Sequence, residues 1–285
     1  MPQTFSPLRY PGGKTSYSNL METLIELNEL GNCVFVEPFA GGAGAALNLL
    51  FREKVSSLIL NDLDFSIYSF WKAILYYTEE FIKLIYDTPI SIIEWRKQKK
   101  IYMSEKDDSL TLGFATFFLN RTNRAGILSA NPIGGITQDG NYKIDARFNK
   151  NNLVEKIKNI AAKKDLIRIY NQDVIIFINT LNTIHAGENL FVYFDPPYFG
   201  KGKLLYLNHF DYKQHVSLHD SISKFKQPWV LSYDNSPDIA EIYKEYPIYQ
   251  KSLRYFITKP STAKELIISN LQMPSDLNVL WRYQK

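Results

Sequence analysis

Cysteine is almost absent from this sequence, which has a single one, Cys33, among 285 residues. One thiol excludes an internal disulfide and a cysteine-built zinc site, and it fits a reducing compartment. No apolar run approaches the roughly 18 residues that a membrane span requires. The amino-terminal residues also lack the apolar core of a secretory signal, so we expect a cytoplasmic protein with no membrane partner.

Signatures of metal and ATP chemistry are missing as well. The pattern Gly-x-x-x-x-Gly-Lys-Ser/Thr does not occur, so the sequence does not support ATP-driven chemistry. His215 and His219 share a helical spacing, but no Glu stands between them as it does in zinc proteases. We therefore expect no metal ion and structural histidines.

The composition is otherwise that of a globular protein, with 45% hydrophobic and 22% charged residues. Lys and Arg number 33 against 29 Asp and Glu, a net charge of +4 that is compatible with nucleic acid without indicating it. Aromatic residues reach 14%, and we expect most of them to fill the core. The length suits one large domain, or one domain with a sizeable insertion.

Short apolar runs rich in β-branched and aromatic residues indicate buried strands, with helical patterns between several of them. The candidates are Val34–Val36, Leu58–Leu60, Leu166–Tyr170, Leu190–Phe194, Trp229–Ser232 and Leu266–Ile268. Strands that alternate with helices predict an α/β fold with a parallel sheet.

The connection between the second and third strand candidates is far longer than the dozen or more residues that a crossover needs. It predicts an inserted subdomain over 66–164, within a catalytic domain formed by 1–65 and 165–285. The insertion looks helical to about Leu119 and turn-rich over 131–141. Amide and cationic side chains in it are candidate DNA contacts, although a solvated charged face is the alternative. They are Asn120, Arg121, Asn123, Arg124, Lys143 and Arg147.

A glycine-rich turn follows the first strand candidate, in the run Glu37-Pro38-Phe39-Ala40-Gly41-Gly42-Ala43-Gly44. Glycine lets the backbone approach a ligand closely, and the following helix offers free N–H groups at its start. Asp62 follows the second strand candidate, at a position where an acid commonly binds ribose hydroxyls. The pattern predicts a nucleoside-containing cofactor, and the alternative is a packing turn with no ligand.

The identity of that cofactor follows from two residues. Leu47 stands where a dinucleotide fingerprint would have its third glycine. Glu37 brings a carboxylate to the loop, a poor neighbour for a pyrophosphate and a good one for an ammonium or sulfonium. Both features favour S-adenosylmethionine, which is cationic and carries no phosphate.

The run Asp195-Pro196-Pro197-Tyr198 follows the strongest strand candidate. Two prolines cannot continue a central strand, so the loop leaves it at the carboxyl end, where open α/β sheets bind ligands. An Asp oxygen and a Pro carbonyl could accept hydrogen bonds from an adenine 6-amino group and make its nitrogen more nucleophilic. The Tyr ring could stack on a base extruded from a duplex. The alternative is a tight turn with a packed tyrosine.

The order of cofactor loop, long insertion and Asp-Pro-Pro-Tyr loop resembles the Dam-type DNA adenine methyltransferases over nearly the whole chain. Leu8-Arg9-Tyr10-Pro11-Gly12-Gly13-Lys14 is similar to that family's amino-terminal motif. The resemblance implies that Lys14 meets the methionine carboxylate, that Tyr10 lies against the cofactor, and that Asp62 holds the ribose. Asp173, which follows the third strand candidate, matches the position that meets the cofactor adenine, and Asp195 belongs to the catalytic loop.

The same resemblance implies a mostly parallel, seven-stranded Rossmann-like methyltransferase sheet with one antiparallel strand near the end. It makes the mainly helical insertion a target-recognition domain, opened by Phe118-Leu119-Asn120-Arg121. Leu231–Asn235 and Lys264–Asn270 resemble late strands that support the target pocket. Beyond its opening, the insertion departs from the members that recognise GATC, so no recognition sequence is predicted.

Together these features predict a site-specific adenine methyltransferase that uses S-adenosylmethionine and acts on double-stranded DNA. We expect a bacterial or phage protein, a monomer or weak dimer, with a cognate restriction endonuclease as a separate partner. Methylation of RNA or of a protein amide is an alternative, although those relatives more often have Asn at the position of Asp195. A DNA-binding protein that has lost catalysis is another, although every motif position looks intact.

Overall fold

The computed structural model describes residues 4–9, 17–104, 108–200, 210–256, 260–275 and 277–281. The chain folds as two compact units. The first comprises Met1–Gly13, Gly41–Gly44 and Asp64–Asn171, and the second comprises Lys14–Ala40, Ala45–Leu63 and Gln172–Lys285. The first unit thus contains the insertion expected at 66–164, together with residues before position 14 and the glycine turn. None of the helices in the described ranges has the length and hydropathy of a transmembrane segment.

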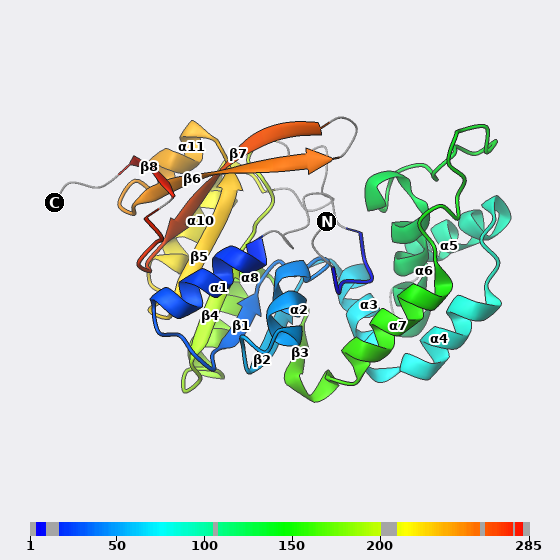
Figure 1. Ribbon diagram of the computed structural model, residues 1–285, viewed down its shortest axis with the longest axis horizontal. Helices are drawn as coiled ribbons and strands as arrows, with labels where there is room; N and C mark the ends of the chain where they lie inside the picture. The colour runs from blue at the N-terminus through cyan, green and yellow to red at the C-terminus, as the bar shows by residue number, and fades with distance from the viewer. Residues whose placement is uncertain are drawn as a thin grey trace. The chain divides into compact units, whose positions relative to one another are not determined.

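The second unit is built on a mixed sheet whose strands lie in the order β2-β1-β4-β5-β7-β6-β8 (Figure 1). These strands are β1 (Val34–Glu37), β2 (Ser57–Asn61), β4 (Leu190–Phe194), β5 (Trp229–Asp234), β6 (Ile248–Phe256), β7 (Pro260–Ser269) and β8 (Asn278–Trp281). From β2 to β5 all neighbours are parallel. β7 pairs antiparallel with both β5 and β6. The α/β class is confirmed, and every strand candidate in this unit is a strand.

Two strands, β6 and β8, were not predicted from the sequence. In β6, polar and apolar residues are interspersed without a continuous apolar run, and a search for fully buried runs therefore passes over it. β8 is short and pairs antiparallel with β6. The sheet consequently has a second strand, besides β7, that runs against its parallel part.

Five helices of the described residues accompany this sheet. They are α1 (Ser18–Leu27), α2 (Gly44–Phe51), α8 (Val174–Thr183), α10 (Tyr212–Ile222) and α11 (Pro237–Ile242). Aspartate side chains cap two of them, α8 and α10. Asp211 and Gln214 form a reciprocal capping box at the start of α10. Phe35, Phe191 and Trp229 are among the fully buried side chains of the sheet, so the aromatic surplus does fill the core here.

The first unit is mainly helical, as expected for the insertion (Figure 1, cyan to green). Its elements are α3 (Phe65–Tyr76), α4 (Thr78–Asp87), α5 (Ile92–Ser104), α6 (Ser109–Thr122), η2 (Arg124–Gly126), α7 (Lys150–Ala161), η3 (Lys164–Leu166) and β3 (Ile167–Tyr170). Phe70 and Phe117 stack at 6.0 Å between ring centres, and Phe81 packs edge-on against both. A Cβ on Gly113 would lie 2.5 Å from the Ser69 carbonyl oxygen, so glycine lets α6 lie close against α3.

Candidate active site

The strand order reverses at β1, which has β2 on one side and β4 on the other, both parallel to it. In open α/β sheets, ligands bind outside the carboxyl ends of the strands at such a switch point. Glu37 is the last residue of β1, and Asp195 directly follows β4. The two carboxyl groups that the sequence singled out therefore stand at the edge where this fold binds ligands.

Glu37 is buried, with 5% of its surface exposed, and its Oε1 accepts a 2.9 Å hydrogen bond from the Ala46 N–H. Burial raises the pKa of this carboxyl to about 8. The Ala46 N–H works against that shift, and the nearby Asp195 charge adds to it. Glu37 therefore holds its proton at neutral pH while the site has no ligand. A cation brought to it would favour the ionised form.

The glycine turn has two residues in the left-handed region. Gly41, with φ 45°, has the freedom of glycine, whereas Ala43 adopts φ 46° in spite of its Cβ. The Gly41 carbonyl accepts a 2.9 Å hydrogen bond from the buried indole N–H of Trp71, which holds the turn within the first unit. Pro38, Gly41 and Gly42 are buried, whereas Phe39 and Gly44 are half-buried.

Asn61, the last residue of β2, organises the backbone beside the predicted ribose acid. Its side-chain N–H groups donate to the carbonyls of Pro38 at 2.9 Å and Gln172 at 3.0 Å. Its Oδ1 accepts the Gln172 N–H at 2.9 Å. Asp62 follows and is half-buried. Asn61 is therefore a positioning residue that links the end of β2 to the Pro38 carbonyl and to the Gln172 backbone. No sequence pattern had indicated this role.

Asp173 was assigned to the cofactor adenine, and the structure gives its side chain a local role. Its Oδ1 accepts a 2.9 Å hydrogen bond from the Ile175 N–H and caps the start of α8. The carboxyl is half-buried. A capped position keeps the side chain in one orientation at the end of its strand.

Asp195 is held by a serine that lies on the neighbouring strand. Ser232 Oγ donates a 3.0 Å hydrogen bond to Asp195 Oδ1, and the hydroxyls of Ser232 and Tyr193 lie 2.9 Å apart. Ser232 and Tyr193 are both buried. This chain of contacts starts in the sheet core and ends on the carboxylate, so it fixes where Asp195 points.

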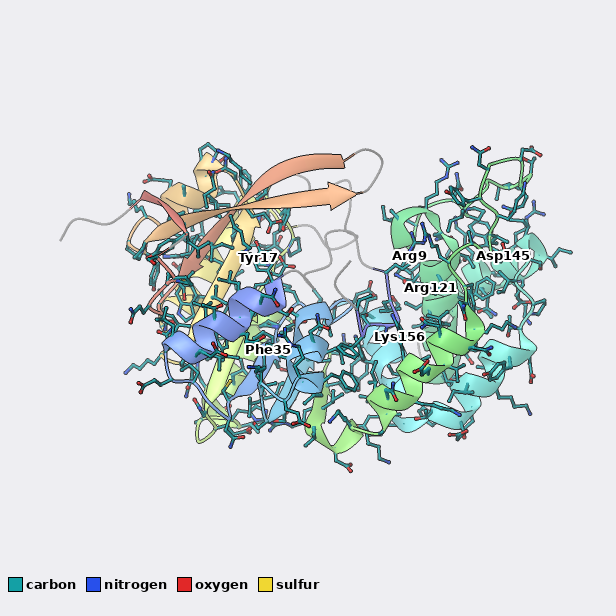
Figure 2. The ribbon with its side chains drawn as sticks, viewed as in Figure 1. Arg9, Tyr17, Phe35, Arg121, Asp145 and Lys156 are labelled. Atoms are coloured by element: carbon teal, nitrogen blue, oxygen red, sulfur yellow. The ribbon has the colours of Figure 1, made fainter. Side chains whose placement is uncertain are left out.

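Tyr198 is held by Glu265 of β7. The Tyr198 hydroxyl donates to Glu265 Oε1, and the Tyr17 hydroxyl donates to Glu265 Oε2. Glu265 is 1% exposed, and Tyr17, which Figure 2 labels, is fully buried. Tyr17 is the first described residue after the amino-terminal motif, whose Tyr10 and Lys14 lie outside the described residues.

The loop after Tyr198 is tied to the end of β5. Asp234 accepts the Phe199 N–H at 2.9 Å and the Gly200 N–H at 2.8 Å. Pro196 is buried, and Pro197 is half-buried. The run from Asp195 to Gly200 is therefore anchored through the side chains of Asp195 and Tyr198 and through the backbone N–H groups of Phe199 and Gly200.

Two of the predicted DNA contacts are scaffold residues of the first unit. Asn120 accepts the Arg9 backbone N–H at 2.7 Å and donates to the carbonyls of Arg9 and Gly126. Asn123 donates to the carbonyls of residues 127 and 128 and accepts the Trp95 indole N–H at 2.6 Å. Their exposed fractions are 1% and 0%. Buried amides must be satisfied internally, and that need outweighs a surface role here.

The predicted cationic contacts differ in exposure. Arg124, Lys143 and Arg147 are exposed, and Lys143 Nζ donates a 2.6 Å hydrogen bond to the Gln138 carbonyl. Arg121 is half-buried, and its guanidinium donates from Nε to the Arg147 carbonyl at 2.8 Å. The pKa of Arg121 is lowered to about 9, mainly by burial and in addition by the charges of Arg9 and Arg147.

The described histidines have protein partners. His185 Nδ1 lies 2.6 Å from Glu188, and His215 Nδ1 lies 2.8 Å from the Tyr233 hydroxyl. Among residues that the structure describes, no group of three or more His, Cys, Asp or Glu is placed to hold a metal ion. Cys33 is fully buried, and burial raises the pKa of its thiol to about 11, as befits a packing residue.

A sheet with an acid and a glycine turn at its switch point, followed by an Asp-Pro-Pro-Tyr loop, defines an amino-group methyltransferase of the Rossmann type. The chain belongs to the D12 class N6 adenine-specific DNA methyltransferase family, whose model matches residues 10–257. The enzyme thus methylates adenine in DNA, and S-adenosylmethionine is its methyl donor.

Two individual proteins are similar to this chain. The chain is 27% identical over 206 residues to the Type II methyltransferase M.MjaIII of Methanocaldococcus jannaschii, covering 67% of this chain and 68% of the relative. Among solved structures, the rRNA methyltransferase aviRa of Streptomyces viridochromogenes aligns over 92% of this chain and 86% of its own. That alignment has 12% identity and a TM-score of 0.41.

Proposed function

We propose that Asp195, Pro196, Pro197 and Tyr198 hold a flipped adenine of a short site in duplex DNA for methylation. The observation that carries this proposal is the double anchoring of the loop. Ser232 holds the Asp195 carboxylate, and Glu265 holds the Tyr198 hydroxyl. Groups that must aim at one nitrogen need fixed rotamers, and a buried second layer of hydrogen bonds provides them.

Methylation of an adenine 6-amino group requires two hydrogen-bond acceptors for its N–H bonds and a surface on which the base can stack. The lone pair of an adenine 6-amino group is delocalised into the ring, so the nitrogen is a weak nucleophile. An oxygen of Asp195 and the Pro196 carbonyl accept its N–H bonds and favour the pyramidal, more nucleophilic form. Tyr198 offers its ring face to the extruded base. As the nitrogen bonds to the methyl group, the methyl–sulfur bond would break with its electron pair remaining on sulfur. The nitrogen then sheds one proton, for which the Asp195 carboxylate is the adjacent acceptor.

S-adenosylmethionine supplies an electrophilic methyl group on a sulfonium. In this proposal, Glu37 to Gly44 and Asp62 bind it, with Tyr10, Lys14 and Asp173 contributing as the family motif implies. The buried Glu37 carboxyl supports the assignment, because a cationic ligand would compensate the cost of ionising it. Asn61 keeps the Pro38 carbonyl and the Gln172 backbone in place around that site.

Target recognition is proposed for the helical insertion, residues 66–164, and catalysis for residues 1–65 and 165–285. The exposed cations Arg124 and Lys143 flank the turn-rich stretch 131–141 of the insertion, and loops commonly carry binding residues. Guanidinium and ammonium groups in such loops suit the edges of guanine and the phosphates.

The cellular setting is part of the same proposal. We place the enzyme in the cytoplasm of a bacterium or of a phage-infected cell, as a monomer or weak dimer, with a separate cognate restriction endonuclease. The support for that partner is the relative's description as a Type II methyltransferase.

Methyl transfer from labelled S-adenosylmethionine to mixed-sequence unmethylated duplex DNA tests the proposal. Single-molecule sequencing then maps the modified bases. We expect label on adenine within one recurring short motif. Asp195→Ala should abolish transfer while calorimetry still detects cofactor binding, and the exposed Asp238→Asn should behave as the wild type.

Two results would contradict the proposal in different ways. Turnover by Asp195→Ala would remove the catalytic role of that carboxylate. Label on RNA or protein, with none on DNA, would transfer the activity to the alternative substrates.

A further inference from the structure

Four cationic side chains gather in the first unit beside the amino-terminal segment. They are Arg9, Arg121, Arg147 and Lys156, from four separate stretches of sequence. Figure 2 shows Arg9, Arg121 and Lys156 within the same region of this unit. The charges of Arg9 and Arg147 act on Arg121, and the charge of Arg121 acts on Lys156. The four groups therefore form one electrostatic cluster.

No carboxylate of the described residues forms an ion pair with any of the four. The ion pairs that the structure records elsewhere link other residues, such as Arg52 with Glu22 and Lys54 with Glu22. Asp145, which is labelled in Figure 2, lies two positions before Arg147 and is exposed. Like charges brought together without counter-charge repel one another, so this arrangement costs stability unless an anion joins it.

Three of the four cations are nevertheless held in place by uncharged backbone carbonyls. Arg121 donates to the carbonyls of Arg147 at 2.8 Å and Pro7 at 3.5 Å. Arg9 Nη1 donates to the Asn123 carbonyl at 3.2 Å, and Lys156 Nζ donates to the Ser6 carbonyl at 3.3 Å. These contacts leave most N–H donors of Arg9 and Lys156 for a ligand. The cluster is therefore ordered without being neutralised.

The backbone of residue 9 is fixed just as firmly. Asn120 clamps both the N–H and the carbonyl of Arg9, each at 2.7 Å. Gly126 has φ 78°, and a Cβ there would lie 2.3 Å from the Arg9 carbonyl oxygen. The structure thus uses a buried amide and a glycine to bring the amino-terminal segment, with its cation, against α6.

We infer that Arg9, Arg121, Arg147 and Lys156 form a phosphate-binding site for the DNA backbone, independent of base sequence. The inference rests on the proposed function, because it assigns the anion to the enzyme's DNA substrate. One phosphodiester carries one charge, whereas a duplex presents one charge per about 1.7 Å of its axis, which suits a four-cation cluster. An arginine guanidinium can donate two parallel hydrogen bonds to two oxygens of one phosphate, and a lysine ammonium contributes a compact positive charge.

The same inference assigns phosphate contacts and base contacts to different residues of this unit. Phosphate contacts set the register and orientation of a protein on DNA, and base contacts read the sequence. The cluster would therefore set the register, while exposed side chains such as Arg124 remain for the reading of bases. Lys156 was not a candidate at the level of sequence, because one lysine on a helix with several others carries no distinguishing signal.

Lys156→Gln and Lys158→Gln make a matched pair of variants for the test. Both residues lie on α7 and both changes remove one positive charge, but Lys156 is half-buried at the cluster and Lys158 is exposed. Binding of a mixed-sequence duplex is measured by fluorescence anisotropy as a function of salt concentration. We expect Lys156→Gln to weaken binding and to reduce the slope of log K against log salt by about 0.9, the value of one phosphate contact. Lys158→Gln should keep the wild-type affinity and slope.

Thermal unfolding with inorganic phosphate, against chloride at equal ionic strength, gives an independent reading. We expect phosphate to raise the unfolding midpoint of wild type and Lys158→Gln, and to raise that of Lys156→Gln less. Equal salt slopes for the two variants would overturn the inference. Phosphate stabilisation combined with an unchanged DNA slope would assign the site to a free phosphate and also overturn it. A wild type that binds duplex through the cluster but transfers no methyl group would refute the proposed function alone.

Discussion

Ser232 Oγ donates a 3.0 Å hydrogen bond to Asp195 Oδ1 from the neighbouring parallel strand. The donor is itself within 2.9 Å of the buried Tyr193 hydroxyl. The orientation of the Asp195 carboxylate is therefore determined by residues of the sheet core as well as by its own loop.

Ser232→Ala is expected to lower kcat by about 10- to 100-fold, because the Asp195 carboxylate loses the contact that orients it. Cofactor affinity should change little, since Ser232 makes no contact with the Glu37 loop. The Tyr193 hydroxyl also loses a buried partner, which should cost about 1–3 kcal/mol of stability. Single-turnover kinetics and thermal unfolding measure the two effects, with the exposed Ser217→Ala as the control. A wild-type kcat in Ser232→Ala would contradict the positioning role.

Glu265 is expected to act on catalysis through the Tyr198 hydroxyl, which can be tested with a double-mutant cycle. Glu265→Gln and Tyr198→Phe each remove or weaken the same contact, so the double variant should be no slower than the slower single variant. Tyr17→Phe removes the other phenol from the same carboxylate and should lower kcat much less. Additive effects of Glu265→Gln and Tyr198→Phe on kcat would show that the two residues act separately.

Glu37 should make the unliganded protein less stable as pH rises. Its pKa is about 8 in the folded protein against 4.5 for a free carboxyl, so the folded state holds one more proton between these values. The stabilisation from the neutral carboxyl is complete below pH 4.5 and is lost as pH rises through about 8. Relative to Glu37→Gln, the wild type should lose about 1.4 kcal/mol per pH unit in that window. Denaturant unfolding from pH 5 to 8 measures the difference, and parallel curves would contradict it.

Binding of S-adenosylmethionine should release a proton from the same carboxyl below pH 8. A cationic ligand favours the ionised form, so affinity should rise with pH up to about 8. Calorimetry in buffers that differ in ionisation enthalpy counts the released protons. Glu37→Gln should bind without this release, and a release equal to that of the wild type would place the titrating group elsewhere.

Asn120→Ala should destabilise the protein by about 1–3 kcal/mol, because it strips three buried backbone groups of their partner. Asn120→Asp keeps the acceptor for the Arg9 N–H but places a buried carboxylate oxygen against two carbonyl oxygens, so it should destabilise the protein at least as much as Asn120→Ala. Denaturant unfolding measures the loss. If Asn120→Ala kept full stability and lost only DNA affinity, the side chain would be a DNA contact as the sequence suggested.

Much of the catalytic half could be predicted because its signals are local. The strand runs are buried on both faces and therefore read as continuous apolar segments, and each motif stands at the carboxyl end of one of them. β6 was missed because its polar and apolar residues are interspersed, and its place in the sheet depends on pairing with β7. Asn61, Ser232 and Glu265 were missed as positioning residues for a related reason. Their partners are remote in sequence, and no spacing rule connects them.

By itself, the sequence determined the α/β class, the enzyme family and the cofactor, and it pointed to the insertion and to the loop to which we assign catalysis. Each of these rests on residues that are adjacent along the chain or on the burial of a short run. Tertiary structure alone decided which polar side chains are available for chemistry. Asn120 and Asn123 look like DNA contacts in a list of residues, but burial commits their amides to the protein's own backbone. Burial likewise raises the pKa of Glu37, and folding brings Arg9 and Lys156 to Arg121, because solvent exclusion and charge proximity exist only once the chain is packed.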